Sequence, residues 1–253
     1  MVQMDNFQAP EVLAAKPEYS GGDRLMTEVP AVPFEFSKLP KGDPLLNEVY
    51  KLRYKVYCDE WEFEKHEDHP GGIERDEFDD HSVHFIAKRK SDNLIIGTIR
   101  LIKYSAKGFL IEKHCQIDAD LSAYDKSLFG ELSRLAVSKE YRKRATDAAY
   151  EGKIVDDAEI DNMYGGKRRM ENDIVLGLYK CIYRECLESG QQYLLAVMAK
   201  GLFLLLKRVG IIFEPIGPAQ NYHGLRTPYL GRVDAMVERL KNANPLLYNQ
   251  FLR

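Results

Sequence analysis

The chain has 253 residues, 45% of them hydrophobic and 30% charged, which is enough to bury a large core as one domain with appendages. Its 18 Gly, 11 Pro and 4 Cys exclude collagen-like, low-complexity and disulfide-scaffold proteins. Lys and Arg number 36 against 39 Asp and Glu, a formal net charge of −3, which argues against DNA or another bulk polyanion as a partner.

No segment of the sequence reads as a targeting signal or a membrane anchor. The most apolar stretch, Tyr193–Leu206, is interrupted by Lys200 and is too short to cross a bilayer. The first thirty residues carry no basic cluster followed by an apolar run, so we expect no signal peptide. The four cysteines form no C-x-x-C pair, which favours buried reduced thiols. We therefore expect a cytoplasmic protein without a membrane span.

The N-terminal part is predicted to be an extended arm over residues 1–43, because six of the eleven prolines lie in the first 44 residues. Asp43 and Pro44 are typical of a helix start, and apolar residues at helical spacing follow them. Beyond this helix the sequence predicts three strands, of which the first two form a hairpin: Val83–Lys88, Leu94–Lys103 and Gly130–Val137.

The C-terminal part alternates between helix and strand. Residues 145–170 lose periodicity and change from acidic to basic, so we expect a mobile insertion there. The elements predicted after it are helix Glu171–Ser189, strand Tyr193–Met198, helix Lys200–Val209, strand Ile211–Ile216 and a helix from about Val233 to Leu240. This order predicts an α/β (α+β) domain over 44–230, a mixed, mostly antiparallel sheet flanked by helices, with a helical tail over 231–253.

Charged residues stand at positions that the periodicity places in the core. Arg53 lies on the apolar face of the first helix, and Arg100 and Arg134 lie within apolar strands. An unpaired guanidinium there would be strongly destabilising, so each one needs a carboxylate. The sequence offers Glu74, Asp76 and Asp79 before the hairpin and Glu131 within the third strand.

The sequence therefore predicts a buried network of arginines and carboxylates. By strand alternation, Glu131 and Ser133 share one face and Arg134 points to the other. Such a network can serve only to hold elements together, but convergence from four separate elements favours a functional site for a polar, charged substrate.

The order of these residues resembles the acyl-homoserine-lactone synthases. It resembles still more closely the N-acyl amino acid synthases and the acyltransferases that accompany PEP-CTERM/exosortase systems. The similarity covers roughly residues 44–220 and rests on Arg53-x3-Tyr57, Trp61, Glu74-x-Asp76-x2-Asp79, Gly97-x2-Arg100 and Glu131-x-Ser133-Arg134. It implies a GNAT fold and transfer of a fatty acyl group from acyl carrier protein to the amine of an amino acid, with no cofactor.

The resemblance also implies roles. Glu131 would be the base, beside Ser133, and the strand's backbone N–H groups would hold the oxyanion at Leu135, Ala136 and Val137. Arg100 and Arg134 would either bind the acceptor's carboxylate or orient the acidic groups. The remaining substrate-binding residues would be Arg53, Tyr57, Trp61, Asp76 and Asp79.

Two departures from the lactone synthases matter. Trp61 follows Arg53 by eight residues, which is closer than in those enzymes. The Gly-rich pyrophosphate loop of CoA-using GNAT enzymes is also missing after the third strand. The basic residues found there instead suit the single phosphate of an acyl carrier protein arm, or are an ordinary solvated turn: Lys139, Arg142, Lys143 and Arg144.

Three alternatives stay open at this point. S-adenosylmethionine as acceptor would make the enzyme an acyl-homoserine-lactone synthase. A GNAT-like module that binds an acyl ligand or amino acid without turnover is the second alternative. The spacing His66-x2-His69 and His81-x2-His84 suggests zinc, but it is loose and no H-E-x-x-H is present, so we expect no metal.

Overall fold

A single mixed sheet forms the centre of the protein in a computed structural model that describes residues 33–142 and 157–252. The strand order is β1-β2-β3-β4-β5-β8-β6, with β7 paired to β8. Neighbours run antiparallel except β4 and β5, which are parallel. The strands are β1 (Phe34–Leu39), β2 (Ser82–Arg89), β3 (Ile95–Lys103), β4 (Phe129–Val137), β5 (Tyr193–Met198), β6 (Glu214–Pro215), β7 (Gln220–Asn221) and β8 (Leu225–Arg232).

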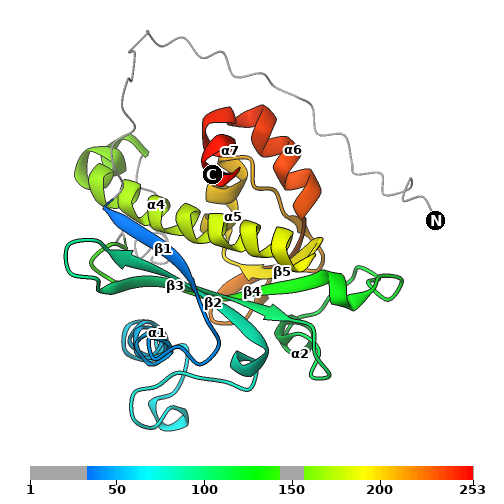
Figure 1. Cartoon of the computed structure of the whole chain (residues 1–253), viewed down its shortest axis with the longest axis horizontal. Helices are drawn as coiled ribbons and strands as arrows, with labels where there is room; N and C mark the ends of the chain where they lie inside the picture. The colour runs from blue at the N-terminus through cyan, green and yellow to red at the C-terminus, as the bar shows by residue number, and fades with distance from the viewer. Residues whose placement is uncertain (1–32, 143–156, 253) are drawn as a thin grey trace. The chain divides into compact units, whose positions relative to one another are not determined.

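Helices cover both faces of this sheet (Figure 1). On one face lie α4 (Asp157–Ser189), α5 (Lys200–Arg208), α6 (Val233–Ala243) and α7 (Pro245–Leu252). On the other lie α1 (Leu46–Tyr54), which continues as the π-helix η1 (Lys55–Glu60), and α2 (Leu110–His114). Three 3-10 turns complete the described elements: η2 (His66–Asp68), η3 (Asp79–His81) and η4 (Lys126–Leu128). The mixed α/β architecture expected from the sequence is confirmed.

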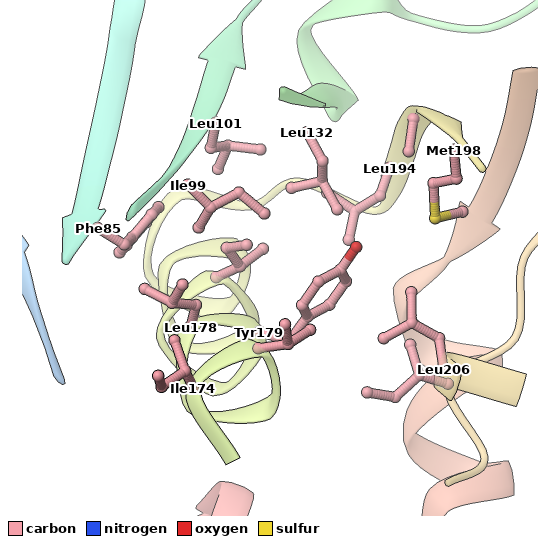
Figure 2. Close-up of a cluster of buried hydrophobic side chains, with 14 of the residues drawn as sticks. Phe85, Ile99, Leu101, Leu132, Ile174, Leu178, Tyr179, Leu194, Met198 and Leu206 are labelled. Atoms are coloured by element: carbon pink, nitrogen blue, oxygen red, sulfur yellow. The ribbon is translucent and has the colours of Figure 1, made fainter. Parts of the chain in front are cut away.

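The face under α4 is an apolar core (Figure 2). Leu178 of α4 is fully buried against strand residues such as Phe85 and Leu101. Gly177 allows β1 to pack closely under the helix, because a Cβ at this position would overlap the ring of Phe36. This core accounts for the strand pattern that the sequence predicts, since β3 is buried on both faces.

The structure corrects the expected arm. Residues Phe34–Leu39 form β1, an edge strand that pairs antiparallel with β2, and Phe34 and Leu39 are buried at its ends. Prolines on either side of this short segment concealed it in the sequence, because they are typical of an extended linker. The rest of the expected arm lies outside the described residues.

The second half of the chain differs from expectation in three places. Helix α4 begins at Asp157 instead of Glu171, so that part of the expected insertion is helical, and residues 143–156 lie outside the description. The expected strand Ile211–Ile216 shrinks to the two residues of β6, and β8 pairs with β5 instead. Pro228 and Gly231 within β8 are typical of loops and concealed that strand.

The final helix predicted from about Val233 to Leu240 is present as α6, and α7 follows it. Met236 and Leu240 of α6 are buried in the core under α4, and Tyr248 of α7 packs against it. Among the described residues, no helix combines the length and the apolarity that a membrane crossing requires.

Candidate active site

A bulge in β4 directs the side chain of Arg134 to the face of the sheet that also carries Arg100. The register between β3 and β4 shifts opposite Thr98–Arg100, and Arg134 has φ +53°, in the left-handed region that non-glycine residues rarely adopt. The expected alternation is therefore broken at Arg134. Its guanidinium joins the same cluster as Arg100 and Ser133, which corrects the prediction that it points to the opposite face.

Arg53 is the most deeply buried member of this cluster. Its side chain is 0% exposed, and it pairs with two fully buried carboxylates from the segment before β2. Its Nε donates to Glu74, and Nη1 and Nη2 donate to Asp79 at 2.6 and 3.2 Å. Helix α1 supplies this arginine from its apolar face, as the spacing predicts.

Arg100 links β3 to the same acidic segment. Its Nη1 and Nη2 donate to the two carboxylate oxygens of Asp76 at 2.6 and 2.9 Å, and Nη1 lies 2.8 Å from Oδ1 of Asp79. Its Nε donates to Ser133 Oγ at 2.9 Å. Each of its three nitrogens thus contacts a protein group, which favours the orienting role among the two expected for Arg100.

Arg134 closes the network on the side of β4. Its Nε donates to Glu74 at 3.0 Å, and its Nη2 lies 3.1 Å from Glu64 and 3.3 Å from Asp76. The structure therefore brings together all the charged residues that the sequence assigned to the network except Glu131, and it adds Glu64. Three guanidinium groups then face four carboxylates.

Guanidinium charges favour the ionised form of the three carboxylates that precede β2, Glu74, Asp76 and Asp79. Burial raises the pKa of Asp76, but Arg100 and then Arg134 outweigh burial, so the pKa is lower than that of an ordinary Asp. The pKa of Asp79 and that of Glu74 are lowered in the same way, by Arg53 above all. By formal charge, four acids beside three arginines leave one excess negative charge, which attracts a cation.

Glu131 is a different kind of carboxyl group. It is 2% exposed and lies beneath α2, where both carboxylate oxygens accept the N–H of Ile111 at 3.1 Å. Burial raises its pKa to about 7, against the lowering effects of the Ile111 N–H and of Arg100. A buried carboxyl that titrates near neutral pH is suited to accept and release a proton.

β4 separates from β5 next to these groups. The two strands pair only from Phe129–Leu132 to Tyr193–Ala196, so 133–137 has no partner on that side. The N–H of Ser138 donates to Ile96 of β3 at 2.8 Å. Since successive amides along a strand point to opposite edges, the N–H groups of Leu135 and Val137 point into the gap, while that of Ala136 points to β3.

Two further expected residues lie apart from each other. Tyr57 belongs with the site: its hydroxyl donates to the carbonyl of Leu135 at 2.9 Å, and Arg134 lies over its ring at 5.5 Å. Trp61 lies further out, where it stacks on Phe63 at 5.7 Å and carries Arg142 over its ring at 5.0 Å.

The basic turn after β4 is only partly available to a ligand. Arg142 forms an ion pair with Glu60 besides its contact with Trp61, whereas Lys139 is exposed. Lys143 and Arg144 lie outside the described residues.

Apart from Asp76 and Arg134, sequence reasoning missed the residues that line the cavity next to the network. This cavity of about 370 Å³ is lined by Glu64, Asp76, Glu77, Phe78, Leu110, Lys113, His114, Arg134, Tyr222 and His223. Tyr222 and His223 form the turn between β7 and β8, and His223 has φ +53°. Of these features, only the turn at His223 and Gly224 was recognisable from the sequence, because His and Gly adopt a left-handed backbone more readily than most residues.

The histidines that suggested zinc go to separate places. His66 Nδ1 lies 2.7 Å from the hydroxyl of Tyr54, His69 lies 3.9 Å from Glu64, and His84 lies 3.5 Å from Asp79. Within 33–142 and 157–252, no group of three or more metal-ligating side chains is assembled.

Comparisons with known proteins find similar sequences. The acetyltransferase (GNAT) domain family matches residues 52–150. An acyl-homoserine-lactone synthase of Vibrio anguillarum is 22% identical over 184 residues, which is 72% of this chain and 80% of that protein.

Solved structures share the fold. The CoA-dependent acyl-homoserine lactone synthase BjaI, solved with MTA, aligns with a TM-score of 0.57 and 16% identity over 86% of this chain and 89% of its own. The synthase LasI aligns with a TM-score of 0.53 and 17% identity over 83% and 92%. Together, the domain match and the relatives support an acyltransferase with the GNAT fold that is related to the acyl-homoserine-lactone synthases.

Proposed function

We propose that the protein transfers a fatty acyl group from an acyl carrier protein thioester to the amine of an amino acid. The ammonium group first gives up one proton, which a base takes and passes to solvent, and the neutral amine nitrogen then attacks the thioester carbonyl. The C–N bond forms, the C–S bond breaks, and the second proton lost by the nitrogen goes to the departing thiolate. The products are an N-acyl amino acid and the free carrier thiol, and no other cofactor takes part. The arrangement of Glu131 beside the negatively charged network carries this proposal.

The acceptor's ammonium group is placed by the exposed edge of the network. Asp76 and Glu64 are 21% and 22% exposed, whereas Glu74 and Asp79 are fully buried, and both exposed acids line the cavity. The excess negative charge of the network is therefore accessible only there. An ammonium group bound at this edge is attracted without displacing any arginine.

Glu131 supplies the base. An amino acid arrives protonated and has to lose a proton before it can attack. The pKa of Glu131 near 7, caused by burial, allows it to take that proton at neutral pH. Since its side chain is almost completely buried, the proton reaches it through a water molecule from the cavity side of α2.

The gap between β4 and β5 suits the thioester carbonyl. Its oxygen, negatively charged in the tetrahedral intermediate, can accept from the N–H groups of Leu135 and Val137, which have no strand partner there. The hydrogen bond from Tyr57 to the Leu135 carbonyl holds this part of β4 in place. Rigid donors are what such stabilisation requires.

The opposite face offers an apolar place for the acyl chain. A cavity of about 30 Å³ lies between α4, β5, α6 and α7 and is lined by Tyr179, Ile182, Tyr183, Leu194, Ile211, Val233, Met236, Val237, Leu240 and Tyr248. It holds little more than one water-sized group, so a fatty acyl chain has to push the lining side chains apart. The residues that the sequence suggested for the chain are mostly core: Leu206 is fully buried, and Leu202 and Phe203 pack against the same cluster.

Carrier protein is proposed as donor because the turn after β4 lacks glycine. Its backbone from Ser138 to Arg142 folds on itself, with the N–H groups of Tyr141 and Arg142 both donating to the Ser138 carbonyl. Those amides are not available to cradle a pyrophosphate, as a Gly-rich loop would do. Exposed Lys139 can instead meet one phosphate on an acidic carrier. The association with PEP-CTERM/exosortase systems and a cytoplasmic location remain parts of this proposal.

A second candidate is acylation of S-adenosylmethionine to give an acyl-homoserine lactone. The names of the relatives favour it, since the Vibrio anguillarum protein, BjaI and LasI are all acyl-homoserine-lactone synthases. S-adenosylmethionine also carries an ammonium group and would use the same exposed acids.

A product assay separates these candidates. Purified protein is incubated with acyl carrier protein or CoA thioesters of several chain lengths, together with a mixture of amino acids or with S-adenosylmethionine, and the products are identified by mass spectrometry. We expect N-acyl amino acid and free carrier thiol in equal amounts. An acyl-homoserine lactone with methylthioadenosine would establish the second candidate, and binding without any product would establish a non-catalytic module.

A further inference from the structure

Arg226 differs from the other arginines around the site. Arg53, Arg100 and Arg134 are each held by carboxylates at hydrogen-bond distance. Arg226, half-buried on β8, has no carboxylate within 4.0 Å among residues 33–142 and 157–252. Its guanidinium lies over an aromatic ring, with Cζ 5.6 Å from the centre of the Phe63 ring.

The position of Arg226 on β8 directs it to the face that carries the network. Its neighbour along the same face, Leu230, packs with Phe78 and Ile216, whereas Tyr229 points to the other face and stacks on Phe203 at 4.8 Å. The last β5 residue, Met198, pairs with Thr227, so Arg226 lies just beyond the end of β5. This is where β4 has separated from β5.

Arg226 is also next to the wall of the 370 Å³ cavity. The ring of Phe63 that it covers lies 5.3 Å from the ring of His223, and His223 Nε2 lies 3.6 Å from Glu64. Burial lowers the pKa of His223, and the charge of Glu64 raises it. The charges of Arg134 and then Arg226 lower this pKa further, which indicates that Arg226 lies close to His223. A guanidinium without an acidic partner thus stands beside a carboxylate-rich edge.

Backbone strain around this place supports a binding role. Four non-glycine residues in the described chain have φ above zero, and three of them, Glu62, Arg134 and His223, surround Glu64 in the sequence or in space. Each such residue costs about 1–3 kcal/mol, and such costs concentrate at ligand sites.

We propose that Arg226 binds the carboxylate of the acceptor amino acid while Glu64 and Asp76 bind its ammonium group. The expected carboxylate ligands, Arg100 and Arg134, are already paired with protein carboxylates that offset their charge, so the acceptor needs another cation. Arg226 supplies it, with two parallel N–H donors that match a carboxylate. This inference rests on the proposed function and makes Arg226 a residue that selects acceptors with a free carboxylate.

Binding measurements without the thioester test this directly. Affinities for L-leucine, L-phenylalanine and L-tyrosine, each beside its methyl ester, are measured by calorimetry for wild type, Arg226→Gln and Arg226→Lys. Arg232→Gln is the matched control, because Arg232 is on the same strand but is exposed and paired with Asp234. We expect Arg226→Gln to weaken binding of the free acid by about tenfold or more and leave the ester unchanged. Arg226→Lys should fall between, and Arg232→Gln should match wild type.

Kinetics with the same variants identify the anion. The KM for the amino acid should rise in Arg226→Gln while kcat and the KM for the carrier thioester stay close to wild type, which also shows that the variant is folded. A rise confined to the thioester KM would assign Arg226 to the carrier's phosphate and overturn the proposal. The proposal would also be overturned if Arg226→Gln lost affinity equally for the free amino acid and for its methyl ester, or if wild type bound both with the same affinity. If wild type forms no N-acyl amino acid at all, it is the proposed function that fails.

Discussion

Both faces of the sheet are buried, but the side chains that cover them differ in polarity. Under α4, the space is filled by apolar side chains such as Leu178, Ile99 and Leu132 (Figure 2). Under α1 and α2, on the other face in Figure 1, fully buried Arg53 and Arg100 meet Glu74 and Asp79. Burial of apolar side chains stabilises a fold directly, whereas buried ion pairs roughly repay their own desolvation.

The difference between the faces indicates which of them serves chemistry. A sheet of this size gains nothing in stability from charges on its second face that apolar residues would not also give. The charged face is also where three of the four strained non-glycine residues lie and where one strand pair opens. The apolar face therefore supports the fold, and the proposed function assigns the reaction to the charged face.

The largest expected effect is that of Glu131→Gln. We expect turnover to fall at least about 100-fold, because the base is removed while the Ile111 N–H keeps an acceptor. The same change should stabilise the protein at pH 8. A carboxyl group whose pKa rises from 4.5 to about 7 on folding contributes stability below pH 4.5 and loses it as the pH rises through 7.

The expected gain in the free energy of unfolding at pH 8 is at most about 3 kcal/mol, and it should vanish near pH 4.5. Urea unfolding of wild type and Glu131→Gln at the two pH values measures it. If Glu131→Gln turns over at the wild-type rate, Glu131 is not the base. If the variant is less stable than wild type at pH 8, burial does not raise the pKa of Glu131 as described.

Replacement of one side chain on each face sharpens the comparison. Arg53→Met should cost about 3–5 kcal/mol, because it leaves Glu74 and Asp79 buried with fewer positive partners. Leu178→Met, a conservative change on the apolar face, should cost less than about 1.5 kcal/mol. Chemical denaturation of both variants at pH 7 tests this, and similar costs for the two would show that the faces do not differ as described.

A smaller effect is expected at Glu185, the buried acid at the edge of the apolar face. It joins Lys38 of β1 and Lys103 of β3 to α4 at 2.6 and 2.7 Å. Since both lysines are partly exposed and can be hydrated, Glu185→Gln should cost about 1 kcal/mol. The loss should be visible at pH 7 and disappear at acidic pH, because the lysines lower the pKa of Glu185 below 4.5. A loss of stability as large as that of Arg53→Met would mean that the ion pairs of Glu185 contribute as much to stability as those of Arg53 do.

The fold was predictable where the sequence has a single strong period. Strand Tyr193–Met198 has the bounds expected from the sequence. β3 and β4 differ from expectation by one residue at one end, and β2 by one residue at each end. β8 was missed because Pro228 and Gly231 stand inside a strand whose pairing partner, β5, comes from an earlier segment. Long-range pairing overrode the local signal there.

The part of the site that was predictable consists of charged residues that stand within apolar segments of the sequence. Arg53, Arg100 and Arg134 were found in this way, although the bulge that redirects Arg134 leaves no mark in the sequence. Glu64, His223 and Arg226 were not found, because charged residues in loops and at a strand end look like ordinary solvated residues. Only the tertiary fold brings them to the cavity.

The pH dependence of kcat at saturating substrates tests the central claim most directly. If Glu131 takes the amine's proton, kcat has an acid limb with an apparent pKa near 7, falling as the pH falls because the protonated carboxyl cannot act as base. An unchanged kcat between about pH 5.5 and 8 would contradict the assignment of Glu131 as base.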